Sequence, residues 1–303
     1  MDESREMNSV GLVTPTYGRD LERCALLCES VDRYVTSYAK HYLIVADEEL
    51  ALFARFNGRR REVLPLSQLL PPWLKPLPGF IRRKNRRYWW SFRAMPVSGW
   101  HVQQFVKIAA ASQFPEQRTC MLDSDVVFFR PFDVAGFEQP NPAPLFIRPR
   151  EIAADATLHA PWVRSSHRLL GLAEPMFPAD DFIGHIICWD RRTVRAMIAR
   201  IEEVTRLDWL EALCRARDVS EYLLYGHFVC NAAGFMSDHR CTTKNLCLSY
   251  WDAAALDEPE VEQMLRSAAA DYVAFSAASF SETPVHRVRS VLGRLAGPQK
   301  RVA

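Results

Sequence analysis

Short apolar runs alternate with amphipathic segments along the beginning of the chain. A short apolar run is typical of a buried strand, whereas apolar residues that recur every three or four positions are typical of a helix. Leu21, Ala25, Cys28 and Val31 fall on one face of such a helix. The predicted elements are a strand at 9–13, a helix at 21–34, a strand at 41–46, a helix at 48–56 and a strand at 63–66. This alternation predicts a mixed α/β fold with a mainly parallel sheet, right-handed crossovers and flanking helices.

Polar side chains follow the first two predicted strands. Thr14, Thr16, Tyr17 and Arg19 come after the first strand, and Asp47 comes after the second. Open parallel sheets bind their ligands at the carboxyl ends of the strands. We therefore expect these side chains to lie at a ligand-binding edge. Asp47 has an equally simple alternative role, because an acidic residue is favoured at the start of a helix.

Two carboxylates, Asp123 and Asp125, lie between apolar runs in the segment CMLDSDVVFFR at 120–130. Carboxylates at the end of a buried strand are costly unless a partner satisfies them. In extended backbone, side chains two positions apart face the same way, so both could reach one ion. Mg²⁺ and Mn²⁺ prefer such oxygen ligands. The alternative is a solvated turn in which both aspartates act as turn formers.

The rest of the chain predicts further helices and strands around this segment. The predicted elements are a helix from about residue 100, a strand at 183–189, helices at 193–203 and 209–217, a helix after Ser220 and a strand at 272–275. Ser220 is a suitable N-cap, with Glu221 in the first turn. Asp180 and Asp181 form a polar pair before the strand at 183–189.

Three motifs together resemble a known family. They are the Asp-Ser-Asp of 123–125, the Gly-Trp…Gln-Gln…Lys of 99–107 and the Ser-Glu-Tyr…Tyr-Gly of 220–226. The combination resembles nucleotide-sugar-dependent glycosyltransferases of the GT-A (Rossmann-like) fold, and within them a bacterial group often described only as a domain of unknown function. The resemblance covers about residues 9–290. It implies one domain over 1–303, with a nucleotide-sugar-binding half at about 9–135, an acceptor-binding half at about 136–290 and a basic tail at 291–303.

The resemblance also implies roles for individual residues. The implied ligands of Mn²⁺ or Mg²⁺ are Asp123, Asp125 and the C-terminal His286. The implied contacts to the nucleotide sugar are Thr14, Thr16, Tyr17, Arg19, Asp47, Lys107 and Asp123. The implied general base is Glu221, with Asp181 and Asp180 as the next candidates.

The activity implied by the resemblance is transfer of a sugar from a nucleoside-diphosphate sugar to a glycan or lipid-linked acceptor, in the synthesis of bacterial surface polysaccharide. The placement of Glu221 favours an inverting reaction, since inversion requires a base for the acceptor hydroxyl. The chain also lacks the His-X-X-Gly-X-X-Lys-Pro-Trp segment of one large retaining family. An alternative enzyme class is a metal-dependent nucleotidyl- or phosphotransferase that uses the same two aspartates.

Residues 59–93 combine ten basic residues with prolines and a Tyr-Trp-Trp run at 88–90. Such a segment could contact nucleic acid, sugar rings, a pyrophosphate or an anionic membrane. The non-enzymatic alternative is therefore a basic-aromatic nucleic-acid-binding protein. The net charge of +2 and the lack of a recognisable nucleic-acid module argue against a nucleic-acid partner. We expect Arg82 to Trp90 to line the ligand cleft or to lack order without ligand. The basic amphipathic tail at 285–301 is compatible with peripheral membrane contact or with a docked helix.

Composition adds only broad limits. The 303 residues are 49% apolar and 24% charged, which is typical of a globular enzyme. The eight cysteines contain no Cys-X-X-Cys pair, so a zinc ribbon is not predicted. A polar N-terminus without an apolar signal segment and scattered thiols predict a cytoplasmic location.

Overall fold

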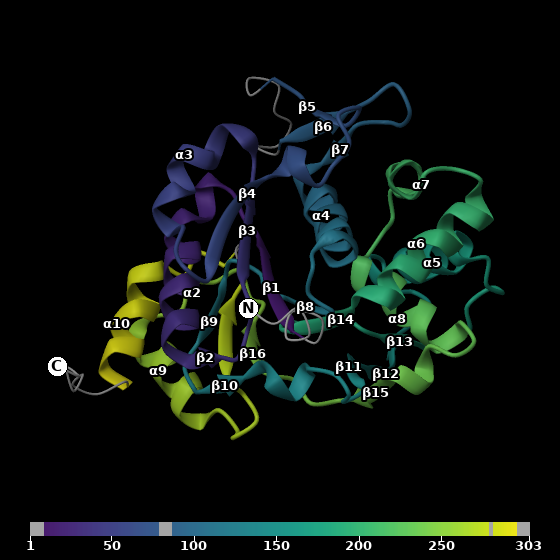
Figure 1. Ribbon diagram of the computed structural model, residues 1–303. Coiled ribbons are helices and arrows are strands. Elements are labelled where there is room, and N and C mark those ends of the chain that lie inside the picture. Colours follow the sequence, from purple (N-terminus) through teal and green to yellow (C-terminus); the bar gives the residue numbers. More distant parts are fainter. Residues whose placement is uncertain (1–8, 79–86, 279–280, 296–303) are drawn as a thin grey trace.

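The computed structural model describes residues 9–78, 87–278 and 281–295 (Figure 1). Its centre is a five-stranded sheet in the order β14-β8-β1-β3-β4. The strands are β1 (Val10–Pro15), β3 (His41–Val45), β4 (Arg61–Pro65), β8 (Arg118–Met121) and β14 (Ile187–Asp190). The first four are parallel, and β14 runs antiparallel to β8. The mixed α/β fold with a mainly parallel central sheet is therefore confirmed, and it is compatible with a Rossmann-like fold.

Helices cover both sides of this sheet, with α2, α3, α9 and α10 on one side and α4 to α8 on the other (Figure 1). The helices are α2 (Leu21–Tyr34), α3 (Leu50–Phe53), α4 (Gly99–Gln113), α5 (His159–Leu170), α6 (Arg191–Thr205), α7 (Trp209–Ala216), α8 (Glu221–Asn231), α9 (Glu258–Ser267) and α10 (Val285–Leu295). In the described ranges, no helix has the length and apolar character needed to cross a membrane.

Small sheets surround the central one. Their strands are β2 (Val35–Thr36), β5 (Lys75–Pro76), β6 (Tyr88–Trp90), β7 (Val97–Ser98), β9 (Val126–Phe128), β10 (Phe132–Asp133), β11 (Ala143–Phe146), β12 (Arg148–Ile152), β13 (Ala179–Asp181), β15 (His239–Thr242), β16 (Cys247–Tyr250) and β17 (Ala274–Ala277). The sheet that matters most for the site has the order β16-β17-β9. Since β9 follows β8 closely, the chain passes from the central sheet to this sheet within residues 122–125.

Two predicted elements differ from the structure. The predicted helix at 48–56 is instead two 3₁₀ turns on either side of the four-residue α3. The predicted strand at 183–189 begins only at Ile187, because Ile186 has φ +61°. That left-handed conformation is costly for a β-branched residue and breaks an extended strand. The result is a bend at residues 185–186, immediately before β14.

Apolar side chains from both faces of the sheet form the core. On the side of α4, the cluster includes Val13, Phe105, Ile108 and Trp189, all at most 1% exposed. On the side of α2, Leu12, Leu27 and Cys120 pack with residues of β9. The short loop between β8 and β9 is therefore fixed at both ends by strands with fully buried side chains.

Candidate functional site

The candidate site lies at the carboxyl end of β8, where the loop to β9 carries Asp123 and Asp125. The helix α4 packs against β1 and β8 and presents Lys107 toward this loop. The helix α8 packs against α4 and begins at Glu221. Ser220 caps α8 as predicted, because its hydroxyl accepts a hydrogen bond from the backbone N–H of Leu223 at 3.4 Å.

Lys107 joins these three elements. Its Nζ lies 2.8 Å from Asp123 Oδ1 and 3.1 Å from Glu221 Oε1, and it donates to the Tyr222 hydroxyl at 2.9 Å. Burial alone would lower the pKa of Lys107, but Asp123, Tyr222 and Glu221 together raise it well above its usual value. An ammonium has three N–H donors, and these three partners use all of them. In this arrangement Lys107 has no donor left for the nucleotide sugar that the resemblance assigned to it.

Glu221 is buried, with a side chain that is 5% exposed. Burial raises the pKa of its carboxyl, and the nearby Lys107 ammonium only partly opposes this. The carboxylate therefore faces the inside of the molecule, beside Asp123, rather than the outer surface. A carboxylate with a raised pKa is the kind of group that accepts a proton efficiently near neutral pH.

Asp123 and Asp125 have opposite electrostatic environments. Burial works against the charge on Asp123, but Lys107 and His185 outweigh it and lower its pKa. Within the described chain, Asp125 has no such cation in direct contact. Burial, together with the neighbouring Asp123 and Asp20, raises the pKa of Asp125 to about 6, and His185 and Arg23 only partly oppose this rise. Among the described residues, the buried Oδ1 of Asp125 has no hydrogen-bond partner. A buried carboxylate oxygen without a partner is unusual and calls for an explanation.

His185 is the residue that the sequence analysis missed. Its Nδ1 lies 3.7 Å from Asp123 Oδ2, and its ring stacks on Trp251 with centroids 5.5 Å apart and planes 16° apart. Both ring nitrogens are buried and have no hydrogen-bond partner within the described chain. The only signal in the sequence was its position beside Gly184, in the bend before β14.

Among the described side chains around this loop, negative charge exceeds positive charge. Asp20 is also buried there, and burial raises the pKa of its carboxyl. Asp20 forms an ion pair with Arg23 at 3.1 Å and accepts a hydrogen bond from the Ser124 hydroxyl at 3.4 Å. Among the described residues, four carboxylates thus share the region with two nearby cations, Lys107 and Arg23. The unpartnered atoms of Asp125 and His185 are of the types that bind Mn²⁺ or Mg²⁺. In the described chain, however, no three acidic, histidine or cysteine side chains already surround a common point as metal ligands would.

His286, the third metal ligand implied by the resemblance, lies on α10, whose first residue, Val285, lines a small cavity together with Asp125. It is exposed near the start of α10, and its charge interacts with Glu258 at the start of α9. The imidazole that the structure brings to Asp123 is that of His185.

The predicted nucleotide-binding residues divide into buried and accessible ones. Thr14 is fully buried and hydrogen-bonds to His41 Nε2 at 3.0 Å. Because Arg61 Nε donates to His41 Nδ1 at 3.1 Å, the proton is on Nε2, which donates to the threonine hydroxyl. Burial accordingly lowers the pKa of His41 well below its usual value. The hydroxyl of Thr14 is therefore part of the core and does not face a ligand.

The other predicted residues lie where β1 and β3 end. Thr16 is buried beside Cys24, Tyr17 is half-buried, and Arg19 is exposed. Asp47 is exposed and accepts a hydrogen bond from the backbone N–H of Ser67 at 3.2 Å. Tyr17, Arg19 and Asp47 thus remain accessible at the carboxyl edge of the sheet.

Asp180 and Asp181 are occupied within the protein. Asp181 is fully buried, forms an ion pair with Arg148 and accepts the backbone N–H of Ile183 at 2.8 Å. Asp180 accepts the backbone N–H of Arg150 at 2.9 Å. These contacts hold β12 and β13 together. Of the three predicted base candidates, Glu221 is the one placed beside Asp123.

Part of the predicted basic-aromatic segment lies within the described residues. Residues 88–90 form β6, which pairs with β5 and β7, and Trp89 is buried. Arg87 forms an ion pair with Glu48, in the 3₁₀ turn that follows β3. Residues 82–86, which carry most of the basic run, lie outside the described residues.

Comparison with known proteins gives a family but no activity. Residues 7–292 match the family of unknown function DUF6492, and the chain belongs to this family. A search of curated proteins finds no match to the chain.

Proposed function

We propose that this chain is a metal-dependent glycosyltransferase of the GT-A type. It would transfer a sugar from a nucleoside-diphosphate sugar to a hydroxyl group of a glycan or lipid-linked acceptor, as in the synthesis of bacterial surface polysaccharide. The observation that carries the proposal is the loop at 123–125. Its two aspartates lie at the carboxyl edge of a parallel sheet, and the buried Oδ1 of Asp125 and both ring nitrogens of His185 have no hydrogen-bond partner among the described residues.

The order of the strands supports this class of enzyme. Four parallel strands are joined by the antiparallel β14, and a second small sheet starts directly after the two aspartates. Ligands of open α/β sheets bind at this edge. The accessible Tyr17, Arg19 and Asp47 occupy the same edge and are the proposed contacts to the nucleotide.

Asp123, Asp125 and His185 are the residues that would hold Mn²⁺ or Mg²⁺. Such an ion, when bound, supplies positive charge next to the diphosphate of the donor. A bound ion would also satisfy the unpartnered carboxylate oxygen and an imidazole nitrogen.

Glu221 is the proposed general base. The oxygen of the acceptor hydroxyl forms a bond to the anomeric carbon of the donor sugar. At the same time, the proton of that hydroxyl moves to the Glu221 carboxylate. The bond between the anomeric carbon and the diphosphate oxygen breaks, and the diphosphate leaves. Lys107 holds Glu221 and Asp123 in fixed positions through hydrogen bonds at 3.1 and 2.8 Å. Attack opposite the leaving diphosphate inverts the anomeric configuration.

The direct test is thermal unfolding with a panel of UDP-, GDP-, CDP- and dTDP-sugars, each with Mn²⁺, with Mg²⁺ and with EDTA. A ligand at about one hundred times its dissociation constant adds about 2.7 kcal/mol to the apparent stability. We expect at least one nucleotide sugar to raise the melting temperature only when the metal is present. In Asp123→Asn, that metal-dependent rise should be lost.

Failure of every nucleotide sugar to stabilise the protein with either metal would contradict the proposal. An equal rise in EDTA would contradict its dependence on metal.

A further inference from the structure

A cavity of about 420 Å³ lies at the opposite end of the central sheet from the candidate site. It opens between α2 and the turn that leads into β4, and Arg55, Arg59, Arg60 and Arg61 line it together with Glu29 and Asp32. Its volume is within the usual range of about 300–1,000 Å³ for pockets that bind small molecules. Because β4 has five residues, the cavity and the carboxyl edge are roughly 16 Å apart along the strand.

The acidic residues of this cavity already have partners. Asp32 accepts hydrogen bonds from Arg61 at 2.6 and 3.2 Å, and Glu29 forms an ion pair with Arg289 of α10. In the described chain, Arg55, Arg59 and Arg60 form no ion pair with an acidic side chain. The cavity therefore carries a positive charge that no described residue neutralises.

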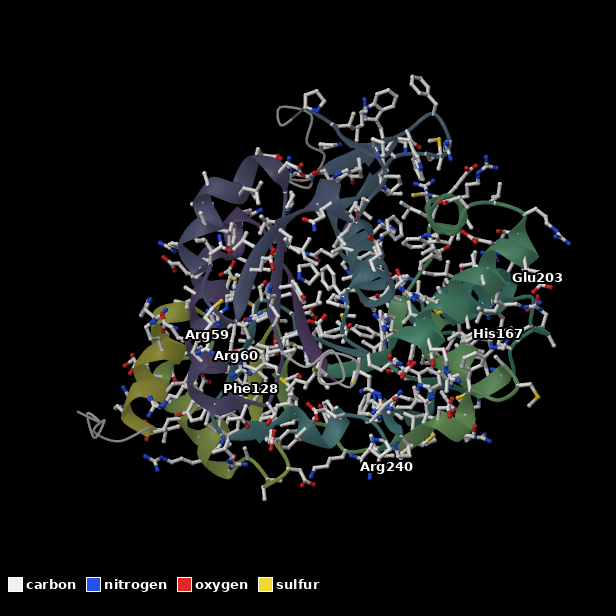
Figure 2. All side chains as sticks on the ribbon, viewed as in Figure 1. Arg59, Arg60, Phe128, His167, Glu203 and Arg240 are labelled. Carbon is white, nitrogen blue, oxygen red and sulfur yellow. The ribbon has the colours of Figure 1, made fainter. Side chains whose placement is uncertain are left out.

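The backbone holds the arginines in place. Gly58 N–H donates to Arg61 O at 2.9 Å, and Arg61 N–H donates back to Gly58 O at 3.3 Å, so Arg59 and Arg60 form the tip of a closed turn. The guanidinium of Arg60 lies 3.8 Å from the centre of the Tyr38 ring and donates to the Tyr38 carbonyl. Figure 2 labels Arg59 and Arg60 next to each other, on the side of the sheet that carries α2. Because the turn is already formed, a ligand would not have to order it.

We propose that this cavity binds a phosphate-bearing anion. Guanidinium groups pair with phosphate oxygens through two parallel hydrogen bonds, and several of them together match an anion that carries more than one negative charge. A free diphosphate and a phospholipid headgroup present the same chemistry. The site does not depend on the proposed glycosyl transfer, because it shares no residue with the loop at 123–125.

The first experiment is calorimetric titration of the full chain with inorganic pyrophosphate at low salt, in EDTA so that no divalent ion takes part. We expect the wild type to bind one pyrophosphate per chain. The double substitution Arg55→Ser and Arg59→Ser removes two exposed guanidinium groups without touching the Arg61–Asp32 pair, and should weaken binding by about tenfold or more.

The matched control is Arg168→Ser with Arg240→Ser, which removes the same charge from exposed positions outside the cavity. Its affinity should equal that of the wild type. Equal weakening in the control, or unchanged binding in the cavity variant, would overturn the proposal.

The second experiment separates the two sources of phosphate. Wild type and both variants are sedimented with phosphatidylcholine vesicles that contain or lack phosphatidylglycerol. Binding that needs phosphatidylglycerol and is lost in the cavity variant assigns the site to a lipid headgroup. Pyrophosphate binding without vesicle binding assigns it to a soluble anion. Absence of both kinds of binding in the wild type would also overturn the proposal.

Discussion

Asp125 and Asp123 are two residues apart, yet their surroundings shift the pKa values of their carboxyls in opposite directions. Lys107 and His185 compensate the charge of Asp123, whereas Asp125 keeps an unpartnered oxygen among the described residues and a pKa of about 6. A folded protein that retains such a group gives up stability at that position. This contrast allows a test by stability that does not require knowledge of the substrate.

Asp125→Asn should stabilise the metal-free protein above pH 6. The folded-state pKa of Asp125 lies above its ordinary value, so its contribution to stability is fully present below about pH 3.8 and is lost as the pH rises through about 6. Removing the charge should therefore raise the free energy of unfolding by roughly 1–3 kcal/mol at pH 7.5. Urea unfolding in EDTA at pH 5 and pH 7.5 measures this.

Asp123→Asn is the matched control, and its effect should have the opposite sign. The folded-state pKa of Asp123 is lowered, so its stabilisation is present at neutral pH and is lost as the pH falls through that pKa. The variant should be less stable than the wild type at pH 7.5. If both asparagine variants lost stability equally, the assigned difference between the two carboxylates would be wrong.

Lys107→Met should destabilise the protein by about 3–5 kcal/mol, because it leaves the buried Glu221 and the adjacent Asp123 without their shared cation. Glu221→Gln in the same chain should recover part of this loss. A double-mutant cycle by urea unfolding gives the coupling energy between the two side chains. A coupling near zero would mean that the ion pair does not form in solution.

At the scale of elements, the contact between α8 and the segment that leads to His185 leaves no free space. A Cβ atom at Gly226 would lie 2.1 Å from the ring of Phe182. The glycine thus allows α8 to approach residues 182–185 closely, and this approach places Glu221 and His185 on either side of Asp123.

Gly226→Ala should destabilise the protein, although alanine is normally the better residue inside a helix by about 1 kcal/mol. The steric cost at Phe182 should exceed that gain, and urea unfolding should show a net loss. Gly293→Ala in α10 is the control, since its Cβ would meet nothing within 4 Å, and it should be neutral or stabilising. A stabilising Gly226→Ala would show that Phe182 moves freely.

The sequence predicted the periodic elements well. The bounds of α2 were predicted to the residue, and α8 begins after its serine cap, because periodicity and capping are local properties. The two-stranded pairs β12–β13 and β11–β15 and the helices α5 and α9 were not predicted. Short strands of this kind depend on a distant partner, and no local pattern specifies that partner.

The candidate site was predicted only in part for the same reason. The local Asp-Ser-Asp motif indicated the loop, and Ser220 indicated the start of α8. Lys107 and Glu221 are 114 positions apart, and only the packing of α4 on α8 brings them together. His185 lies in a bend that depends on the left-handed backbone of Ile186, which its residue type disfavours.

At the scale of the whole molecule, the two predicted halves of the chain are joined through shared sheets. From the second half, β14 completes the central sheet beside β8, and β17 pairs with β9. Each half therefore contributes backbone hydrogen bonds to the other half's sheet.

This sharing predicts a single cooperative unfolding transition. Circular dichroism at 222 nm and tryptophan fluorescence should give the same midpoint in urea, as two-state behaviour requires. Residues 1–135 expressed alone should not form a cooperatively folded unit, because β8 would lose β14 and β9 would lose β17. Two separated transitions in the full chain would instead indicate independent halves.

The passage of the chain from one sheet to another within residues 122–125 has a thermodynamic consequence. Asp123 follows a strand of the central sheet, and Asp125 precedes a strand of the β16-β17-β9 sheet. Any ligand that binds both carboxylates therefore also links the two sheets. By reciprocity, whatever changes the relative position of the sheets changes the affinity for that ligand by the same factor. Substitutions at the interface of the two sheets would then change the affinity for the ligand, although they lie far from it.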